Sequence, residues 1–388
     1  MSAWLASAWK SSLRILLATA AVVAVLLLLS GVRLEGTASA GSRPSESHPS
    51  SSPSAAATSA GCAQCHAAVV SSYSHAAMQN ALVPEGADPV LKAHPSLHAQ
   101  VGPYSYTVES KGAAPTYTVS DGQTSLTLPI HWIFGQHSHT WVLEKDGAYY
   151  ESAVSYFHLE QALGATPGDE NLELHNLTDA IGRKVSQWEL LQCFNCHATH
   201  ATEGEKLTFD RLRLGLGCER CHEGSDQHMS DALHGNFTSR PKSLKTMNAE
   251  ETSEFCGQCH RTWDMAVRNR WHGEADVRFQ PYRLANSRCF LGTDRRISCL
   301  ACHDPHQPES TSVEFYDSKC LACHATAESH AATAEAKETA STVVAKTCPV
   351  SKTKCISCHM PKVTLPGGHG VFTDHQIRIV RAGEEYPD

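Results

Sequence analysis

The sequence has no excess of basic residues. Its 388 residues include 32 Lys and Arg against 40 Asp and Glu, which gives a formal net charge of −8. A chain of this charge has no basic footprint for nucleic acid, so we expect no nucleic-acid partner. An acidic protein favours partners with positively charged docking faces, through a steering that salt weakens.

Large apolar side chains are almost absent from residues 37–60, which are rich in Ser, Pro and Ala and predict a flexible linker. Before it, an apolar run of about 18 residues follows Lys10 and Arg14. We therefore assign residues 1–36 to a signal peptide or an N-terminal membrane anchor. The run is long for a signal peptide, whereas the small residues 37–40 could form a cleavage site. Either way the rest of the chain should face the periplasm, secreted or anchored in the inner membrane.

Cysteine and histidine, by contrast, are abundant and recur together. Cys-x-x-Cys-His occurs seven times among 16 Cys and 24 His, where random placement would give about 0.04 copies. The motif cysteines are Cys62, Cys65, Cys193, Cys196, Cys218, Cys221, Cys256, Cys259, Cys299, Cys302, Cys320, Cys323, Cys355 and Cys358. The motif histidines are His66, His197, His222, His260, His303, His324 and His359.

This motif is the attachment pattern of c-type haem, in which two thiols bond to the porphyrin and the adjacent His becomes the proximal iron ligand. Zinc sites or disulfides are the alternatives, but neither requires a His after every second Cys. The sequence therefore predicts seven covalently bound haem c groups, each with its iron.

The number of residues per haem predicts the fold class. The 328 residues after position 60 would serve seven haems, about 47 residues for each, far below the ~100–150 of an ordinary domain. The haems should then form the core, and the haem-free chain should be largely unfolded. We predict a mainly α and irregular multihaem cytochrome c fold organised around covalently bound haems, with a small antiparallel β insert.

The β insert is predicted in the gap between the first two motifs. Residues 116–119 and 125–128 flank one hairpin turn, and residues 141–143 and 148–152 flank another at Asp146 and Gly147. The predicted division is a first haem segment at 61–99, a β-rich insert at 100–165 and a six-haem domain at 166–388. A structural insert over a haem edge is one interpretation of the β unit, and a substrate-binding role is the other. The motifs after residue 186 should lie on short helices or turns, and Ala325 to Ala345 should form a longer helix.

The second axial ligand decides whether a haem transfers electrons or performs chemistry. Of the 24 histidines, 17 lie outside the motifs, which favours bis-His coordination, whereas few methionines are present. A His close to its own motif more often caps a neighbouring haem, because a short loop cannot reach both faces of one iron. By position the candidates are His75, His137, His139, His200, His228, His306, His369 and His375. His48, His94, His98 and His330 lie in polar or flexible sequence and are not expected to be ligands. Cys289 and Cys348 lie outside the motifs, where a disulfide, free thiols or ligation all remain open.

Several segments resemble the bacterial multihaem cytochromes c related to the tetrahaem cytochrome of ammonia oxidisers, the cytochrome c-552/4 type. They are residues 216–222 with His228, 278–284, 287–290, 299–306, 358–362 and 372–375, and the likeness extends over about residues 61–380. The resemblance implies an extracytoplasmic electron-transfer protein with closely stacked haems. It also implies distal ligands at His75, His139, His228, His306, His369 and His375. Multihaem nitrite reductases carry Lys in place of one motif His, and here all seven motifs end in His.

We therefore expect a periplasmic or membrane-tethered heptahaem cytochrome that carries single electrons between periplasmic or membrane redox proteins. No catalytic residue is assigned, and the oligomeric state is not predicted. The alternative is a multihaem oxidoreductase in which one open-coordination haem acts on a small nitrogen or oxygen compound. Its pocket would lie near His131, His137, His139, Tyr149 or Tyr150, around the first haem.

Overall fold

A computed structural model of the chain describes residues 56–110, 114–135, 138–169, 172–291, 296–325, 348–365, 369–381 and 383–387. All of these residues belong to one compact unit, Pro49–Asp388. The predicted signal peptide or anchor lies outside the described residues, and so does the predicted helix from Ala325 to Ala345 apart from its first residue. Within these ranges, no helix combines the length and the apolar character needed to cross a membrane.

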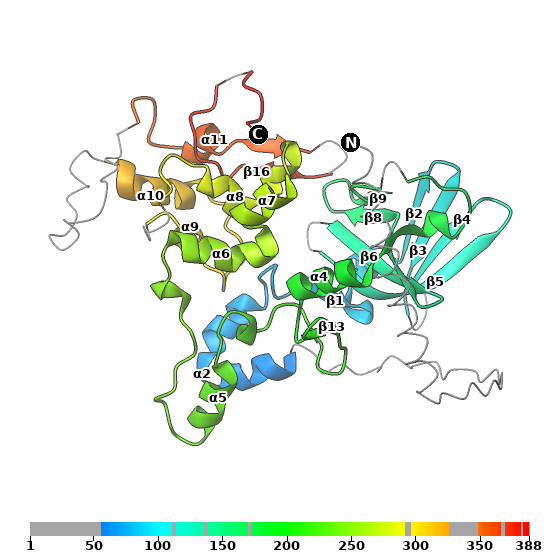
Figure 1. The fold of residues 1–388 in the computed structure, drawn as a ribbon, viewed down its shortest axis with the longest axis horizontal. Helices are drawn as coiled ribbons and strands as arrows, with labels where there is room; N and C mark the ends of the chain where they lie inside the picture. Colours follow the sequence, from blue (N-terminus) through cyan, green and yellow to red (C-terminus); the bar gives the residue numbers. More distant parts are fainter. Residues whose placement is uncertain are drawn as a thin grey trace, which may run out of the picture. The chain divides into compact units, whose positions relative to one another are not determined.

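The described chain contains a ten-stranded antiparallel sheet, coloured cyan to green in Figure 1. Its strands are β1 (Leu82–Pro84), β2 (Ser96–Val101), β3 (Tyr104–Glu109), β4 (Thr116–Ser120), β5 (Ser125–Phe134), β6 (Ser138–Lys145), β7 (Ala148–Ser152), β8 (Val154–Phe157), β9 (Ala162–Ala165) and β10 (Gly182–Val185). The main path runs β10-β7-β6-β5-β4-β3-β2, with β1 paired to β5 and β8 paired to β6 and β9.

Both predicted hairpins are confirmed. Strands β4 and β5 pair from Ser120 opposite Ser125, and β6 and β7 pair from Lys145 opposite Ala148. The second turn has positive φ at both central residues, +53° at Asp146 and +74° at Gly147. This geometry matches the twist of paired strands and is the reason for the Asp-Gly pair.

The prediction of a mainly α fold with only a small β insert is wrong in its proportions. The sheet begins at Leu82 and ends at Val185, beyond both limits of the predicted insert. Strands β1 and β10, which lie wholly outside those limits, are only three and four residues long, and β8 is buried at all four positions. Because a strand covered on both faces has no polar and apolar alternation, periodicity did not reveal it.

Two hydrophobic clusters lie on the sheet. The larger one gathers aromatic and aliphatic residues of β3 to β8, including Tyr106, Tyr117 and Trp141. The smaller one joins Trp132 and Phe134 to Phe194 of the helix α4 (Gln187–His197). The sheet therefore has a core of its own and also holds the helix that carries the second haem motif.

The remaining helices are short. They are α2 (Ala56–Tyr73), α3 (Pro89–Ala93), α5 (Ser225–Leu233), α6 (Ala249–His260), α7 (Trp263–Asn269), α8 (Gln280–Ala285), α9 (Cys299–Cys302), α10 (Val313–His324) and α11 (Cys355–His359), with 3-10 turns η1 (Glu85–Ala87), η2 (Asp179–Ile181), η3 (Cys218–Arg220), η4 (Leu244–Thr246) and η5 (Glu274–Arg278). Three further two-stranded sheets pair β11 (Ala198–Thr199) with β14 (Arg213–Leu214), β12 (Thr202–Glu203) with β13 (Lys206–Leu207), and β15 (Lys362–Thr364) with β16 (Val371–Thr373).

Beyond Leu216, few apolar residues are buried in the described chain. They are Ala249, Ala266, Val277, Leu284 and Leu365. This half of the protein has no hydrophobic core comparable with that of the sheet, so its folding requires another source of apolar surface.

Candidate functional site

Each Cys-x-x-Cys-His motif contains a helical turn, which confirms the prediction made for the motifs after residue 186. Six of the motifs lie on α2, α4, α6, α9, α10 and α11, and the remaining one begins with the 3-10 turn η3. In a helical turn, side chains three residues apart lie on the same face. The two thiols of each motif are therefore presented together, with the histidine next to them.

The second motif shows how the fold positions such a turn. A capping box between Ser186 and Glu189 begins helix α4, which satisfies backbone donors at its first turn. Phe194 then packs its ring edge against Trp132 and Phe134 of the sheet, at centroid distances of 5.2 and 5.4 Å. At the end of the helix, His197 Nδ1 lies 2.8 Å from the carbonyl oxygen of Ala81.

Three motif histidines each face a histidine that belongs to no motif. The pairs, with the distances between ring centroids, are His66–His228 at 6.4 Å, His222–His306 at 5.9 Å and His303–His375 at 6.2 Å. In each pair the second histidine follows a later motif than the first. In all three pairs it follows the motif two further along the chain, so none of these three motif histidines faces a histidine from its own loop or from the next motif in sequence.

These separations fit an iron between the two rings. A metal–imidazole bond is about 2.0–2.1 Å long, and the ring centroid lies about 1.1 Å behind the nitrogen, so two axial imidazoles should have centroids roughly 6.3 Å apart. The donor set also fits, because neutral imidazole is a common axial ligand of haem. The residues present at these three sites therefore suit bis-His haem.

The second ring nitrogen of several of these histidines is held by the backbone. The Nδ1 atoms lie 2.8–3.0 Å from carbonyl oxygens in the pairs His197–Ala81, His222–Lys242, His228–Ser239, His359–Arg378 and His375–Thr373. A metal-ligating histidine almost always donates this proton to a carbonyl or carboxylate, which fixes the tautomer and directs Nε2 at the metal. These carbonyl partners could not be found from motif spacing.

Burial favours the form of histidine that binds iron. Desolvation lowers the pKa of His197, His260, His303 and His375 below the usual value. At neutral pH these imidazoles are therefore held uncharged, as metal ligation requires. An interaction with the side chain of Gln280 acts in the opposite direction on the pKa of His260, but desolvation is the larger effect.

Thiols from different motifs also lie close enough to each other to interact. The pairs are Cys62–Cys218, Cys196–Cys259, Cys256–Cys299 and Cys320–Cys355. Together with the three histidine pairs, these contacts connect all seven motifs into one network. The first motif, which is distant from the others in sequence, is adjacent to the third in space.

The other predicted distal ligands occupy different surroundings. His139 lies on the face of β6 that holds Trp141 and is 1 % exposed, with Nδ1 3.2 Å from Asp88 Oδ1. His369 stacks on Phe157 at 4.1 Å, and His75 is exposed after α2. Their assignment as axial ligands stays a prediction.

Two candidate distal ligands remain, His200 and His137. His200 lies 3.5 Å from a carboxylate oxygen of Glu219, whereas His137 is outside the described residues. Cys289 and Cys348 are both free thiols, so no disulfide joins them.

Comparison with known proteins identifies one related family. Residues 165–223, which include the second and third motifs, match the family model described as cytochrome c554 and c-prime. No curated protein matches the chain significantly. The crystal structure of the outer cell wall cytochrome OcwA is similar with a TM-score of 0.49 and 16% identity, over 83% of this chain and 79% of that one. The family match supports electron transfer by a c-type cytochrome.

Proposed function

We propose that this protein is a heptahaem c-type cytochrome that carries single electrons between redox partners through mainly bis-His haems. The observation that carries the proposal is the set of three facing histidine pairs. Their separations of 5.9–6.4 Å leave room for one iron each. When bound, haem supplies reversible one-electron exchange at its iron.

The chain's own residues would hold the cofactors and restrict their chemistry. The cysteine pairs attach each haem to a helical turn, and the backbone carbonyls keep the axial imidazoles in one tautomer. With an imidazole on both faces, an iron has no open position for substrate. The protein would therefore tune potentials through ligands and burial instead of activating a small molecule.

The contacts between motifs support transfer along the chain. Cys62 adjoins Cys218, and Cys196 adjoins Cys259. Porphyrins attached at neighbouring thiols are close to each other, which is the arrangement that stepwise electron transfer needs. A protein that only stored haem would not need its seven motifs to form one continuous network.

We further propose that the protein acts on the periplasmic side, with redox proteins as partners, secreted or held at the inner membrane through its first 36 residues. The support is the apolar run after Lys10 and Arg14 and the excess of acidic residues, which favours partners with positively charged docking faces.

Low-temperature electron paramagnetic resonance of the oxidised holoprotein, with haem content measured on the same sample, tests the proposal. We expect seven haems per chain and only low-spin signals. A stoichiometric high-spin signal that shifts on adding nitrite, hydroxylamine or cyanide would contradict it. That outcome would favour an oxidoreductase with one open iron.

A further inference from the structure

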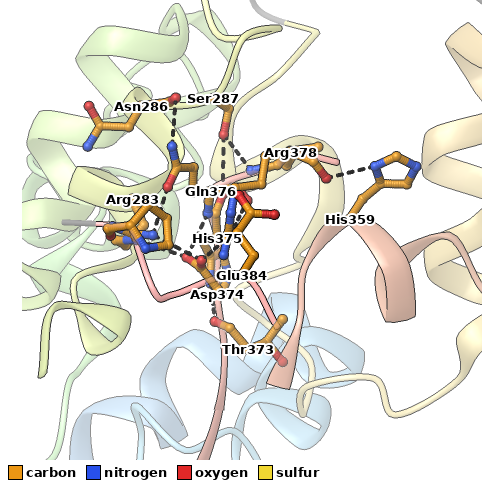
Figure 2. Close-up of polar contacts among 12 residues, drawn as sticks. Arg283, Asn286, Ser287, His359, Thr373, Asp374, His375, Gln376, Arg378 and Glu384 are labelled. Atoms are coloured by element: carbon orange, nitrogen blue, oxygen red, sulfur yellow. Dashed lines mark hydrogen bonds and ion pairs between the residues drawn. The ribbon is translucent and has the colours of Figure 1, made fainter. Parts of the chain in front are cut away.

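A buried ion pair joins helix α8 to the C-terminal segment that follows β16. The side chains of Arg283 and Asp374 are 1% and 0% exposed, and their contact is bidentate, with Nε–Oδ1 at 2.9 Å and Nη2–Oδ2 at 3.0 Å. Figure 2 shows the two side chains facing each other, surrounded by polar partners. Bidentate Arg–carboxylate contacts fix orientation as well as distance.

The segment from Thr373 to Arg378 carries two groups, each of which contacts the histidine of a different haem motif. His375 faces His303 of the fifth motif, with ring centroids 6.2 Å apart. Three residues later, the carbonyl oxygen of Arg378 accepts from His359 Nδ1 of the seventh motif at 2.8 Å (Figure 2). One short segment therefore provides a candidate distal ligand to one iron and orients the proximal ligand of another.

The side chain of Asp374 makes several of the contacts that hold this segment. Its Oδ1 accepts from Gln376 N at 3.0 Å, and its Oδ2 accepts from an Nη1 proton of Arg378. The backbone N–H of Asp374 donates to Pro361 O at 2.9 Å, next to the seventh motif. The carboxylate of Asp374 thus contacts Arg283, Gln376 and Arg378 at once.

Arg283 anchors this carboxylate to the rest of the protein. Its remaining donors reach Pro387 O at 2.9 Å and Gln376 Oε1 at 2.7 Å. Nearby, Ser287 Oγ accepts from Ile377 N at 2.8 Å and donates to His375 O at 3.3 Å. The guanidinium is therefore satisfied on several sides, which a buried charge requires.

We propose that Arg283 and Asp374 are positioning residues that couple two haem sites, holding His375 opposite His303 and the Arg378 carbonyl against His359. The inference rests on the proposed function, because it takes His375 and His359 to be axial ligands. Breaking the pair releases His375 and frees one iron of its cap. It also removes the acceptor that raises the basicity of His359, and a less basic ligand shifts the potential of a second haem upward.

Four variants of the holoprotein test this coupling. Asp374→Asn keeps the shape and removes the charge, and Arg283→Lys keeps the charge and removes the bidentate geometry. His375→Gly removes the ligand itself and leaves the carbonyl of Arg378 in place. Arg183→Lys is the control for a changed Arg–carboxylate contact, because Arg183 of β10 is bound to Glu151 of β7 and to Glu189 at the start of α4, away from the segment Thr373–Arg378.

Haem content, electron paramagnetic resonance and a spectroscopic redox titration are measured for each variant. We expect Asp374→Asn and Arg283→Lys to keep their haem, to convert one haem in seven from low to high spin, and to move a second haem to higher potential. Added imidazole should restore the low-spin state. His375→Gly should give the same spin conversion without the potential shift, and Arg183→Lys should resemble wild type.

The outcomes separate the two proposals. Unchanged spin states and potentials in both Asp374→Asn and Arg283→Lys would overturn the positioning role while leaving the electron-carrier function intact. Loss of haem from every site in both variants would also overturn it, since that would indicate a general folding role. A wild-type protein in which the His303 haem is already high-spin would instead contradict the proposed function.

Discussion

The imidazole planes of His222 and His306 are nearly parallel, with 5° between them and ring centroids 5.9 Å apart. Each ring is held by its own second contact. His222 Nδ1 bonds to Lys242 O at 3.0 Å, and His306 Nδ1 lies 3.2 Å from Asp304 Oδ1. These contacts within the chain therefore fix the orientation of the two rings relative to each other.

The other two facing pairs have larger angles between their planes, 40° for His66–His228 and 31° for His303–His375. Axial ligands and their hydrogen bonds are principal means by which a protein tunes a haem. Three sites with the same ligand types thus differ in ligand orientation, and we expect their signals to be distinguishable.

The first prediction concerns His306. His306→Gly should leave haem attachment intact, because the cysteines and His222 are unchanged, but it should convert one haem from low to high spin. Imidazole added to the variant should restore the low-spin signal. Paramagnetic resonance and visible spectra with and without imidazole measure the change.

His98→Gly is the matched control. His98 is exposed, and its ring lies 3.0 Å from Ser96 Oγ and 3.1 Å from Thr107 Oγ1 in the β unit. A wild-type spectrum for this variant is expected. A His306→Gly protein with only low-spin haem would contradict the ligand assignment.

The second prediction concerns Gly215, where two distant segments touch. Its φ is +71°, and an added Cβ would lie 1.8 Å from the backbone oxygen of Gln79. The neighbouring Leu216 N bonds to Met78 O at 3.0 Å, and Tyr73 bonds to Leu216 O at 2.8 Å. This contact holds the segment after the first motif beside the third motif.

Gly215→Ala should destabilise the holoprotein by roughly 1–3 kcal/mol, because a strained backbone and a backbone clash occur together. Denaturant unfolding measures the loss. Gly204→Ala is the control, since Gly204 also has a positive φ, +61°, but no atom lies within 4 Å of the added Cβ. Equal losses in the two variants would refute the role of the contact.

Sequence patterns predicted the local turns better than the extent of the sheet. The seven motifs and both hairpins depend on local spacing, and local spacing determines a turn such as Asp146–Gly147. The sheet extends beyond the predicted insert. Strands as short as β1 are stabilised only by pairing with their partners, here Leu82 opposite Phe134. A three-residue segment has too little pattern to be recognised alone.

Local sequence also identified the candidate distal ligands only in part. Position near a motif selected His228, His306 and His375 as candidate distal ligands, and in the structure each of them faces a motif histidine. It did not distinguish them from His139, which packs into the sheet beside Asp88. Pairing depends on contacts between segments up to 162 residues apart, as for His66 and His228, and no local rule predicts it.

The third prediction concerns acid stability at the start of α4. Hydrogen bonds from the backbone and hydroxyl of Ser186, and from Arg183, lower the pKa of Glu189 to about 2. Because its folded pKa is below its unfolded value, this carboxylate stabilises the fold fully above about pH 4.5. The stabilisation is lost as the pH falls toward 2.

Glu189→Gln should therefore be less stable than wild type at pH 7, by about 0.5–2 kcal/mol for a lost cap. The difference should shrink between pH 4.5 and pH 2, and unfolding curves across that range measure it. Glu205→Gln, at an exposed turn, should match wild type throughout. A difference between Glu189→Gln and wild type that does not depend on pH would exclude the carboxylate charge as its cause.

The fourth prediction concerns the chain without haem. The sheet has its own apolar core around Trp141, whereas beyond Leu216 the buried apolar residues of the described chain are few and mostly small. Haem must supply the missing apolar surface there, because a fold without a core cannot offset its conformational entropy. The expectation from sequence that the whole haem-free chain unfolds should therefore hold for only part of it.

Protein produced without haem attachment should keep the β unit, residues 82–185, while the part beyond residue 216 is unfolded. Limited proteolysis with mass spectrometry tests this, and a resistant fragment close to residues 82–185 is expected. The holoprotein, digested in parallel, should be protected throughout its haem-bearing segments. Equal digestion of both parts in the haem-free chain would show that the sheet also depends on haem, through the contact between α4 and Trp132.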